Sequence, residues 1–536
     1  MTYKKIVGLS VSCLLIAGCS TAPKNTNVLQ DQRQHSLQNA VIQPIMPAPH
    51  AVMAMPLVER VALPVANTEK YQTIETNTVK SVAVEPISTF SIDVDTGSYS
   101  NVRRYLSREG RLPPQDAVRV EELINYFNYS YPYTASQHPL AVHTETVDSP
   151  WHKGAKVIRI GLKAKEQQYT TLPPANLVFL VDVSGSMDSE DKLPLVKKTL
   201  KILTEQLRPQ DKVTLITYAN GEKIVLETTS GQEKQKILTA IDQLYAEGAT
   251  AGERAMQLAY EVAQKNLIKD GINRIFLATD GDFNVGITNF RTLTGMVSEK
   301  RKLGVSLTTL GFGTGNYNEQ LMEQLADAGD GNYSYIDTEK EARKVVQRQL
   351  SSTLATVAQD VKIQVEFNPV SVKEYRLIGY ENRMLNQADF KNDKVDAGDV
   401  GAGHTVTALY EIIPTDVEGW LNPSRYQTTV KPTGKANEYA QIQVRYKLPQ
   451  ATQSQQLSYI VKATSRPLLQ ASRDTQFALA VASYGQQLRG GEYNANMTWQ
   501  DIISLAQQSA HPDPFGLNTE FVELVKTARN LSSSAK

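Results

Sequence analysis

Residues 176–187, NLVFLVDVSGSM, are the stretch that decides the fold. The apolar run 177–181 has no polar face, which is typical of a central strand in a parallel sheet covered by helices on both sides. Ligand sites in such sheets form at the carboxyl ends of strands, and this run ends in Asp182, Ser184 and Ser186. One carboxylate and two hydroxyls at alternate positions predict a site for a small hard cation such as Mg²⁺. The stretch contains no cysteine or histidine, which argues against zinc.

A second apolar run, residues 274–279 (RIFLAT), also ends in an aspartate, Asp280. Between the two runs, a predicted loop ends in Thr250, which can supply a third hydroxyl. Singly, the two serines and Asp280 also suit ordinary turns. Together these residues resemble the metal-ion-dependent adhesion site of von Willebrand factor type A domains, and the five are Asp182, Ser184, Ser186, Thr250 and Asp280. The resemblance implies that they bind Mg²⁺, or Mn²⁺ or Ca²⁺ in its place.

The same resemblance extends over residues 176–354, where strand and helix patterns alternate. This alternation predicts right-handed crossovers and a doubly wound, Rossmann-like α/β sheet. The stretch LGFGTGNYNEQL, residues 310–321, is also similar to the family's sequence after a later strand. Predicted strands cover residues 176–182, 213–218, 223–228, 275–279 and 305–312, and predicted helices cover 193–207, 233–244, 253–265, 293–301, 317–328 and 339–350.

Strand patterns flank this α/β segment on both sides, and they cover residues 140–147, 156–162, 361–367, 405–412, 440–446 and 457–463. We therefore expect the α/β domain, residues 173–356, to be inserted in a β-sandwich with halves at 87–172 and 357–536. Helical spacing after residue 477 predicts a small C-terminal helical region. The flanks resemble the N-terminal flanking domain and the C-terminal domain of unknown function of bacterial type A lipoproteins.

Residues 1–19 carry two lysines, a short apolar stretch and the ending IAGC, which is typical of a secretory signal and not of a spanning helix. The ending resembles a bacterial lipoprotein box, which implies that Cys19 is lipidated and anchors the chain to a membrane. Ser20 then favours the outer membrane of a Gram-negative envelope, on its periplasmic side or surface; an ordinary signal peptide is the alternative. Residues 20–86 lack a sustained period and predict a flexible tether, although the apolar patch 52–65 could dock on the body.

Composition excludes several functions for the 536-residue chain. The formal net charge is zero, which offers no case for binding nucleic acid. The only cysteine besides Cys19 is Cys13, in the predicted signal peptide, so the mature protein could form no intramolecular disulfide. The motifs G-x-x-x-x-G-K-[ST], H-E-x-x-H and G-x-S-x-G do not occur. We therefore predict that the protein is not an enzyme.

The charge of the predicted site indicates how it would act. Two carboxylates formally balance a divalent ion and hydroxyls add no charge, so the metal can attract an Asp or Glu carboxylate from a protein partner. In the resembled family this is how protein ligands are captured, and the last helix, here 339–350, can shift when the site is occupied. Two alternatives stay open: a structural scaffold stabilised by the metal, and, less favoured, a hydrolase that uses metal-bound water.

Three further polar clusters have simpler interpretations. Asp93, Asp95, Thr96 and Ser98 form one such cluster, which could be a second metal loop. We favour a strand end followed by a helix that is capped by Thr96 or Ser98. The pair Arg103–Arg104 predicts a solvated helix face. A solvated acidic loop is favoured over an adjacent ion site for Asp188, Glu190 and Asp191. Asp282 is interpreted as shaping the loop after Asp280.

Overall fold

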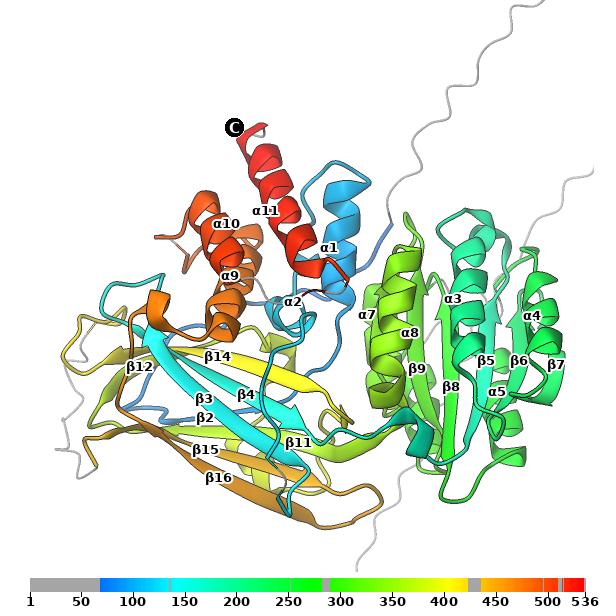
Figure 1. Ribbon diagram of the computed structural model, residues 1–536, viewed down its shortest axis with the longest axis horizontal. Helices are drawn as coiled ribbons and strands as arrows, with labels where there is room; N and C mark the ends of the chain where they lie inside the picture. Colours follow the sequence, from blue (N-terminus) through cyan, green and yellow to red (C-terminus); the bar gives the residue numbers. More distant parts are fainter. Residues whose placement is uncertain are drawn as a thin grey trace, which may run out of the picture. The chain divides into compact units, whose positions relative to one another are not determined.

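Figure 1 shows the computed structural model, which describes residues 68–134, 136–250, 252–281, 290–422, 435–494, 496–509, 513 and 515–534. Cys19, the predicted signal peptide, Asp282 and the part of the predicted tether before residue 68 lie outside the described residues. Among the helices that are described, none has both the length and the apolar content needed to cross a membrane.

The α/β domain is built on a six-stranded sheet with the order β10-β9-β8-β5-β6-β7. Its strands are β5 (Ala175–Asp182), β6 (Lys212–Tyr218), β7 (Glu222–Ser230), β8 (Ile272–Thr279), β9 (Ser306–Phe312) and β10 (Tyr333–Ile336). All neighbouring pairs are parallel except β6 and β7. Strand β5 is central and all eight of its residues are buried.

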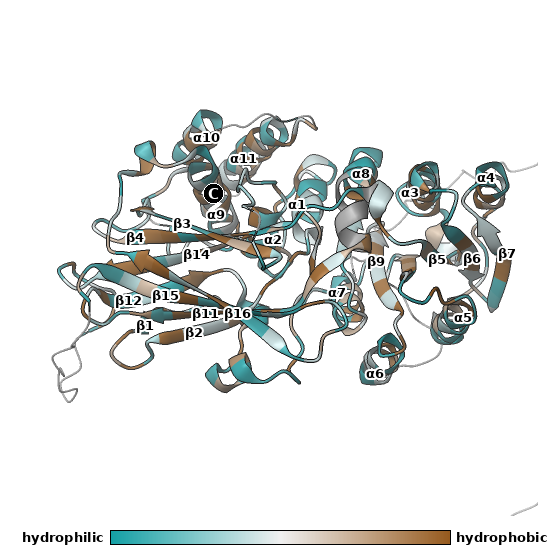
Figure 2. Ribbon diagram, turned by 60° about the horizontal axis from the view of Figure 1, so that its bottom comes forward, coloured by the Kyte–Doolittle hydropathy of each residue, from teal (hydrophilic) through white to brown (hydrophobic). Residues whose placement is uncertain are grey.

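Helices cover both faces of this sheet, as Figure 2 shows. They are α3 (Leu193–Gln206), α4 (Lys234–Asp242), α5 (Gly252–Lys265), α6 (Phe290–Arg301), α7 (Glu319–Ala328) and α8 (Glu339–Leu354). Leu177 and Phe179 of β5 belong to the core under α3, α4 and α8, whereas Val178 and Leu180 belong to the core over α5, α6 and α7. The strand lacks a polar face because alternate side chains enter two different cores, and the predicted doubly wound α/β fold is confirmed.

Two antiparallel sheets form the β-sandwich, with the orders β1-β12-β14-β4-β3 and β13-β11-β15-β16, and β2 also pairs with β11. The strands before the α/β domain are β1 (Lys80–Ser81), β2 (Ile87–Ser91), β3 (Leu140–Asp148) and β4 (Lys156–Ala164). Those after it are β11 (Thr356–Phe367), β12 (Val372–Ile378), β13 (Val400–Gly401), β14 (Thr405–Pro414), β15 (Glu438–Lys447) and β16 (Ser454–Lys462). Each sheet combines strands from both groups, so the α/β domain is inserted between β4 and β11.

A helical layer lies beside the sandwich in Figure 1 and has its own apolar core. It contains α1 (Gly97–Ser107), α2 (Val120–Asn125), α9 (Arg473–Leu488), α10 (Trp499–Gln508) and α11 (Leu517–Ser534). Phe127, just after α2, contacts both Phe477 of α9 and Phe521 of α11 through edge-to-face ring pairs. The C-terminal helical region that the sequence predicts is therefore completed by two helices from the N-terminal flank. Short 3-10 helices lie at Gln115–Ala117, Tyr169–Thr171, Gly185–Asp188, Glu381–Arg383, Gln387–Lys391 and Leu468–Gln470.

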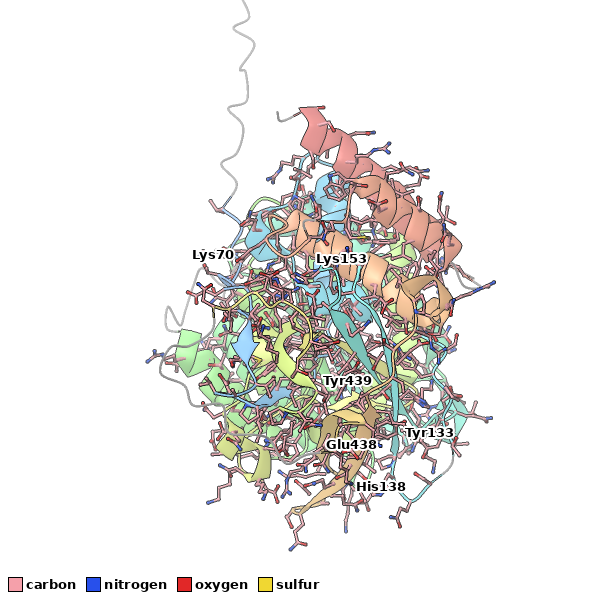
Figure 3. The ribbon with its side chains drawn as sticks, turned by 90° about the vertical axis from the view of Figure 1, so that its left-hand side faces the viewer. Lys70, Tyr133, His138, Lys153, Glu438 and Tyr439 are labelled. Atoms are coloured by element: carbon pink, nitrogen blue, oxygen red, sulfur yellow. The ribbon has the colours of Figure 1, made fainter. Side chains whose placement is uncertain are left out.

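Residues 68–86, which we expected in the tether, instead contact the folded body. Thr68 N donates to Gly315 O at 2.7 Å, and Lys70, labelled in Figure 3, donates from its backbone N to Tyr317 O at 2.9 Å. The Glu69 carboxylate is almost fully buried and accepts a hydrogen bond from Arg104 at 2.9 Å. A buried guanidinium needs a carboxylate partner, and Glu69 is that partner for Arg104. The ion pair therefore holds the chain against the folded body already at residue 69, well before residue 87.

The prediction that Arg103 and Arg104 form a solvated helix face is wrong. Both are buried, and Arg104 is fully covered. Arg103 donates to Asp337 at 2.8 Å and to Glu341 at 2.7 Å, and both acceptors belong to the α/β domain. Helix α1 therefore joins the helical layer to that domain through buried charge.

The cap predicted at Thr96 or Ser98 also differs from the structure. Thr96 occupies the N-cap position of α1, but its side chain makes no capping hydrogen bond. The Ser98 hydroxyl donates to Ala117 O at 2.8 Å, while Ser98 N donates to the Glu122 carboxylate at 2.8 Å. The helix is thus capped by a distant carboxylate. Asp93 and Asp95 lie 3.4 Å and 3.3 Å from the guanidinium of Arg383, so an arginine supplies the cation there.

Candidate metal centre

Two neighbouring parallel strands bring Asp182 and Asp280 to the same edge of the sheet. Asp182 is the last residue of β5, and Asp280 follows the last residue of β8. The two strands pair directly, with Val181 opposite Ala278. Both aspartate side chains are fully buried. Because the carboxyl ends of parallel strands meet at one edge, the central strands place two carboxylates together.

The two serines connect these aspartates by hydrogen bonds. Ser184 N donates to Asp182 Oδ1 at 2.9 Å, and the Ser184 and Ser186 hydroxyl oxygens lie 3.1 Å apart. Ser186 Oγ donates to Asp280 Oδ2 at 2.9 Å. On the other side, Thr279 Oγ1 donates to Asp182 Oδ2 at 2.8 Å. Since Ser186 is exposed while the aspartates are buried, the cluster reaches the surface at this serine.

The loop that precedes Thr250 lies against the loop of the two serines. Gly185 N donates to Gly248 O at 2.9 Å, and Glu247 N donates to Val183 O at 2.7 Å. Gly248 has a φ of +74°, and a Cβ there would lie 2.3 Å from Asn220 Nδ2. A glycine is therefore required for the loop to approach. Thr250 is 6% exposed, and the hydrogen bonds between its loop and the serine loop come from backbone atoms.

Burial and mutual repulsion set the electrostatics of the pair. Burial, followed by the charge of Asp280, raises the pKa of Asp182 to about 6. At neutral pH this carboxyl is therefore mainly ionised in spite of its burial. Two buried like charges, one accepting a hydrogen bond from Ser184 N and the other from Ser186 Oγ, favour the binding of a cation between them.

One cation is already present in the chain and was missed by sequence reasoning. Lys192 Nζ donates to Asp280 Oδ2 at 3.0 Å and to Asn316 Oδ1 at 2.8 Å. Asn316 Nδ2 also donates to Asp280 Oδ2, at 3.0 Å. A local signal was available, because Lys192 is the N-cap of α3, and a lysine is unfavourable at the positive end of a helix dipole.

The donor set fits a hard divalent cation. Mg²⁺ takes oxygen ligands in octahedral geometry at about 2.0–2.1 Å, which separates adjacent ligand oxygens by about 2.9 Å. The observed separations are 3.1 Å between the Ser184 and Ser186 hydroxyls and 2.9 Å between Ser186 Oγ and Asp280 Oδ2. Within the part of the chain that the structure describes, no three His, Cys, Asp or Glu side chains are grouped for metal binding, so this mixed carboxylate and hydroxyl set is the candidate.

The acidic residues beyond Ser186 are separate from this cluster. Asp188 and Glu190 are exposed, as the predicted solvated loop requires. Asp191 instead accepts a hydrogen bond from Ser189 at 2.7 Å and lies 3.7 Å from the guanidinium of Arg108.

Three protein-family models match successive segments of the chain. The model of the von Willebrand factor type A domain matches residues 176–349, and a model of von Willebrand factor matches residues 65–159. A third model, described as "Uncharacterized protein YfbK, C-terminal", matches residues 352–531. The type A match contains all five residues of the candidate metal centre.

Individual proteins are similar over different lengths. The chain is 42% identical to "Uncharacterized protein YfbK" of Escherichia coli (strain K12), over 98% of this chain and 99% of that protein. It is 31% identical to inter-alpha-trypsin inhibitor heavy chain H4 of Homo sapiens, over 29% of this chain and 17% of that protein. The solved structure "von Willebrand factor type A from Catenulispora acidiphila" is 15% identical, with a TM-score of 0.40, and covers 73% of this chain and 91% of its own.

Proposed function

The chain is a von Willebrand factor type A domain protein with a YfbK C-terminal domain and belongs to the family of YfbK, and we propose that it captures a protein partner through a divalent metal ion at the candidate metal centre. Type A domains are mostly interaction modules without catalytic activity, which agrees with a binding role. The proposal adds the metal and the chemistry of the contact.

The observation that carries the proposal is the excess of negative charge at a point that reaches the surface. Asp182 and Asp280 are fully buried and are adjacent at the sheet edge, where Lys192 offers one positive charge against two negative ones. Ser186 is exposed above them. A buried net charge is strongly unfavourable unless it is compensated, so the site favours an external cation.

The charges of the chain's own ligands would allow a bound divalent ion to accept a further carboxylate from a partner. Asp182 and Asp280 balance a divalent ion, while the hydroxyls of Ser184, Ser186 and Thr250 add oxygen without charge. When bound, the ion would supply a coordination position for an Asp or Glu of the partner. Mg²⁺ suits these ligands, and Mn²⁺ and Ca²⁺ accept the same oxygens.

The surroundings of the two aspartates favour capture over hydrolysis. The side chains that donate hydrogen bonds to them include the hydroxyls of Ser186 and Thr279, the ammonium of Lys192 and the amide of Asn316. A hydrolytic mechanism through metal-bound water needs a general base near the ion, and none of these groups has that role at neutral pH.

We also propose that binding takes place at the envelope of a Gram-negative cell. The support is the sequence ending IAGC at residues 16–19, in which Cys19 would carry the lipid, with Ser20 favouring the outer membrane. Palmitate labelling of wild-type protein and of Cys19→Ala tests this part independently. Equal labelling of both proteins would contradict it.

Crosslinking in intact cell envelopes tests the capture of a partner. Full-length protein with Asp182→Ala, and wild-type protein treated with a chelator, should both lose crosslinks that the wild type forms in Mg²⁺. The control variant is Asp188→Asn, which changes an exposed acid in the same loop and should keep those crosslinks. Crosslinks that survive both the chelator and Asp182→Ala would overturn the proposal, and a Mg²⁺-dependent rise in melting temperature without crosslinks would favour a metal-stabilised scaffold.

A further inference from the structure

Lys192 is a basic side chain at the candidate metal centre that lies outside the five-residue pattern. Its ammonium contacts Asp280 and Asn316, and the Asn316 amide contacts the same oxygen of Asp280. The three side chains form a closed ring of hydrogen bonds. Lys192 is only 8% exposed, so its charge acts on Asp280 with little screening by water.

The surrounding backbone fits a long side chain at this position. Gly313 has a φ of +81°, and a Cβ at Gly313 would lie 2.3 Å from Lys192 Cε and 2.4 Å from its Cγ. The stem of the lysine therefore passes through the space that the glycine leaves open. Because Lys192 is also the N-cap residue of α3, where the helix dipole disfavours a positive charge, its contact with Asp280 has to offset both desolvation and the helix dipole.

The net charge of the centre depends on this lysine. Asp182 and Asp280 contribute two negative charges and Lys192 one positive charge, which leaves a charge of −1 without metal and +1 with a divalent ion. Without the lysine charge, the same two states would have charges of −2 and 0. The lysine therefore opposes the entry of a metal cation and favours an anion once the metal has entered.

We propose that Lys192 is a specificity-determining residue of the centre, which weakens metal binding and makes the metal-loaded centre select a carboxylate over a neutral ligand. This inference rests on the proposed function, because it requires a metal at Asp182 and Asp280. The metal and the two aspartates alone have no net charge and so give no preference for an anionic ligand. The charge of Lys192 supplies that preference.

The test compares full-length protein with Lys192→Met, which keeps the stem and removes the charge. The control is Lys198→Met, an exposed lysine on the same helix, and Lys192→Gln serves as a second charge-removing variant if the methionine variant does not fold. Mn²⁺ binding is measured by titration calorimetry and by the electron paramagnetic resonance signal of free Mn²⁺. At saturating Mn²⁺, fluorescence anisotropy measures the affinity of the protein for a short peptide that contains one Asp. The same measurement with an Asn in place of that Asp gives the preference for the carboxylate.

Removing the charge at position 192 should tighten Mn²⁺ binding by about tenfold or more, because a repelling cation next to the ion is lost. The same variant should lose about tenfold of its preference for the Asp peptide over the Asn peptide. Lys198→Met should match the wild type in both. Mn²⁺ binding that appears only in Lys192→Met would overturn the inference, because the wild type would then have no metal-loaded centre to select a carboxylate.

Two other results would overturn the inference in distinguishable ways. If wild-type protein and Lys192→Met bind Mn²⁺ equally and prefer the Asp peptide over the Asn peptide to the same extent, Lys192 does not determine specificity. The proposed metal site would still stand. If neither protein binds Mn²⁺, the proposed metal site fails and the role of Lys192 fails with it.

Discussion

The α/β domain carries two groups of buried charge, the candidate metal centre and the junction with the helical layer. At the junction, Arg103 pairs with Asp337 and Glu341. Arg119, just before α2, lies 2.9 Å from Glu319 and 2.7 Å from Glu323 of α7. At the candidate metal centre, Asp182 and Asp280 are both buried, and Lys192 pairs with Asp280.

The two groups treat their surplus carboxylates differently. Burial raises the pKa of Glu323 to about 8 although Arg119 and Arg383 lower it, so a surplus acid at the junction keeps its proton at neutral pH. Asp182, with a pKa of about 6, loses its proton there. At the junction, arginines pair with the ionised acids and the surplus acid is protonated. At the candidate metal centre, by contrast, the two aspartates and Lys192 together carry one negative charge beside an exposed serine. Burial of charge alone thus does not indicate a binding site, and our proposal rests instead on negative charge that lies close to the surface.

The largest expected effect is at the junction, where each arginine is needed. Arg119→Met should lower the free energy of unfolding by about 3–5 kcal/mol, because it leaves the carboxylate of Glu319 buried without the cation that lies 2.9 Å from it. Urea denaturation measures this change. Arg343→Met, which removes a surface pair with Glu339, should change stability by less than about 0.5 kcal/mol. Equal losses in the two variants would show that the junction is no more than a surface feature.

The second expected effect separates the metal centre from the junction by its response to metal. Mg²⁺ at about a hundred times its dissociation constant should stabilise the wild type by about 2.7 kcal/mol, and Asp182→Ala should lose this gain. Thermal unfolding with and without Mg²⁺ measures the difference. Arg119→Met, tested at a temperature where it is folded, should retain the Mg²⁺ response. A Mg²⁺ response that persists in Asp182→Ala would mean that the ion binds elsewhere.

A smaller effect is expected from the loop that precedes Thr250 and contacts the serine loop. Gly248→Ala should lower the free energy of unfolding by about 1–2 kcal/mol, because the left-handed backbone and the close approach of Asn220 both oppose a Cβ. It should also weaken Mg²⁺ binding, as calorimetry can measure. Gly221→Ala is the matched control, since a Cβ there meets no atom within 4 Å. If both variants bind Mg²⁺ as the wild type does, the position of this loop does not matter for the metal.

The smallest expected effect concerns a protonated acid at the contact between the α/β domain and the sandwich. Burial, with a further contribution from Asp330, raises the pKa of Asp399 to about 8. Because this value is above the unfolded value of about 3.9, the protonated carboxyl favours folding at low pH, and its contribution is lost as the pH rises from about 4 to 8. Asp399→Asn should therefore reduce the fall in melting temperature between pH 5 and pH 8.5 by about 2 °C. Asp416→Asn, at an exposed position, should leave that fall unchanged, and an unchanged fall in Asp399→Asn would contradict the assignment.

Sequence patterns predicted the features that depend on local periodicity. The run 177–181 showed a central strand because its alternate side chains enter two apolar cores. The sequence predicted that Asp182 and Asp280 lie close together, because both end apolar runs and parallel strands end at a common edge of the sheet. The insertion of the α/β domain followed from strand patterns on both of its sides.

Features that depend on distant partners could not be read in the same way. Arg103 and Arg104 look like a solvated pair because Asp337 is 234 positions away, and Glu69, which is 35 positions before Arg104, looked like part of a tether. Lys192 was missed because its partner carboxylate is 88 positions further along the chain. In each case the sequence shows a charge, and only the fold shows which opposite charge covers it.

The insertion of the α/β domain also orders the events of folding. Strand β4 pairs with β14, for example Leu162 with Val406, so the first sheet of the sandwich cannot close until more than the whole α/β domain has emerged, from the ribosome or from a translocation channel. The α/β domain needs no such wait, because its six strands are successive in the chain. Domains generally fold as units during synthesis, and pairings of high sequence separation form slowly. The α/β domain is therefore expected to fold first, and its two ends then bring the halves of the sandwich together.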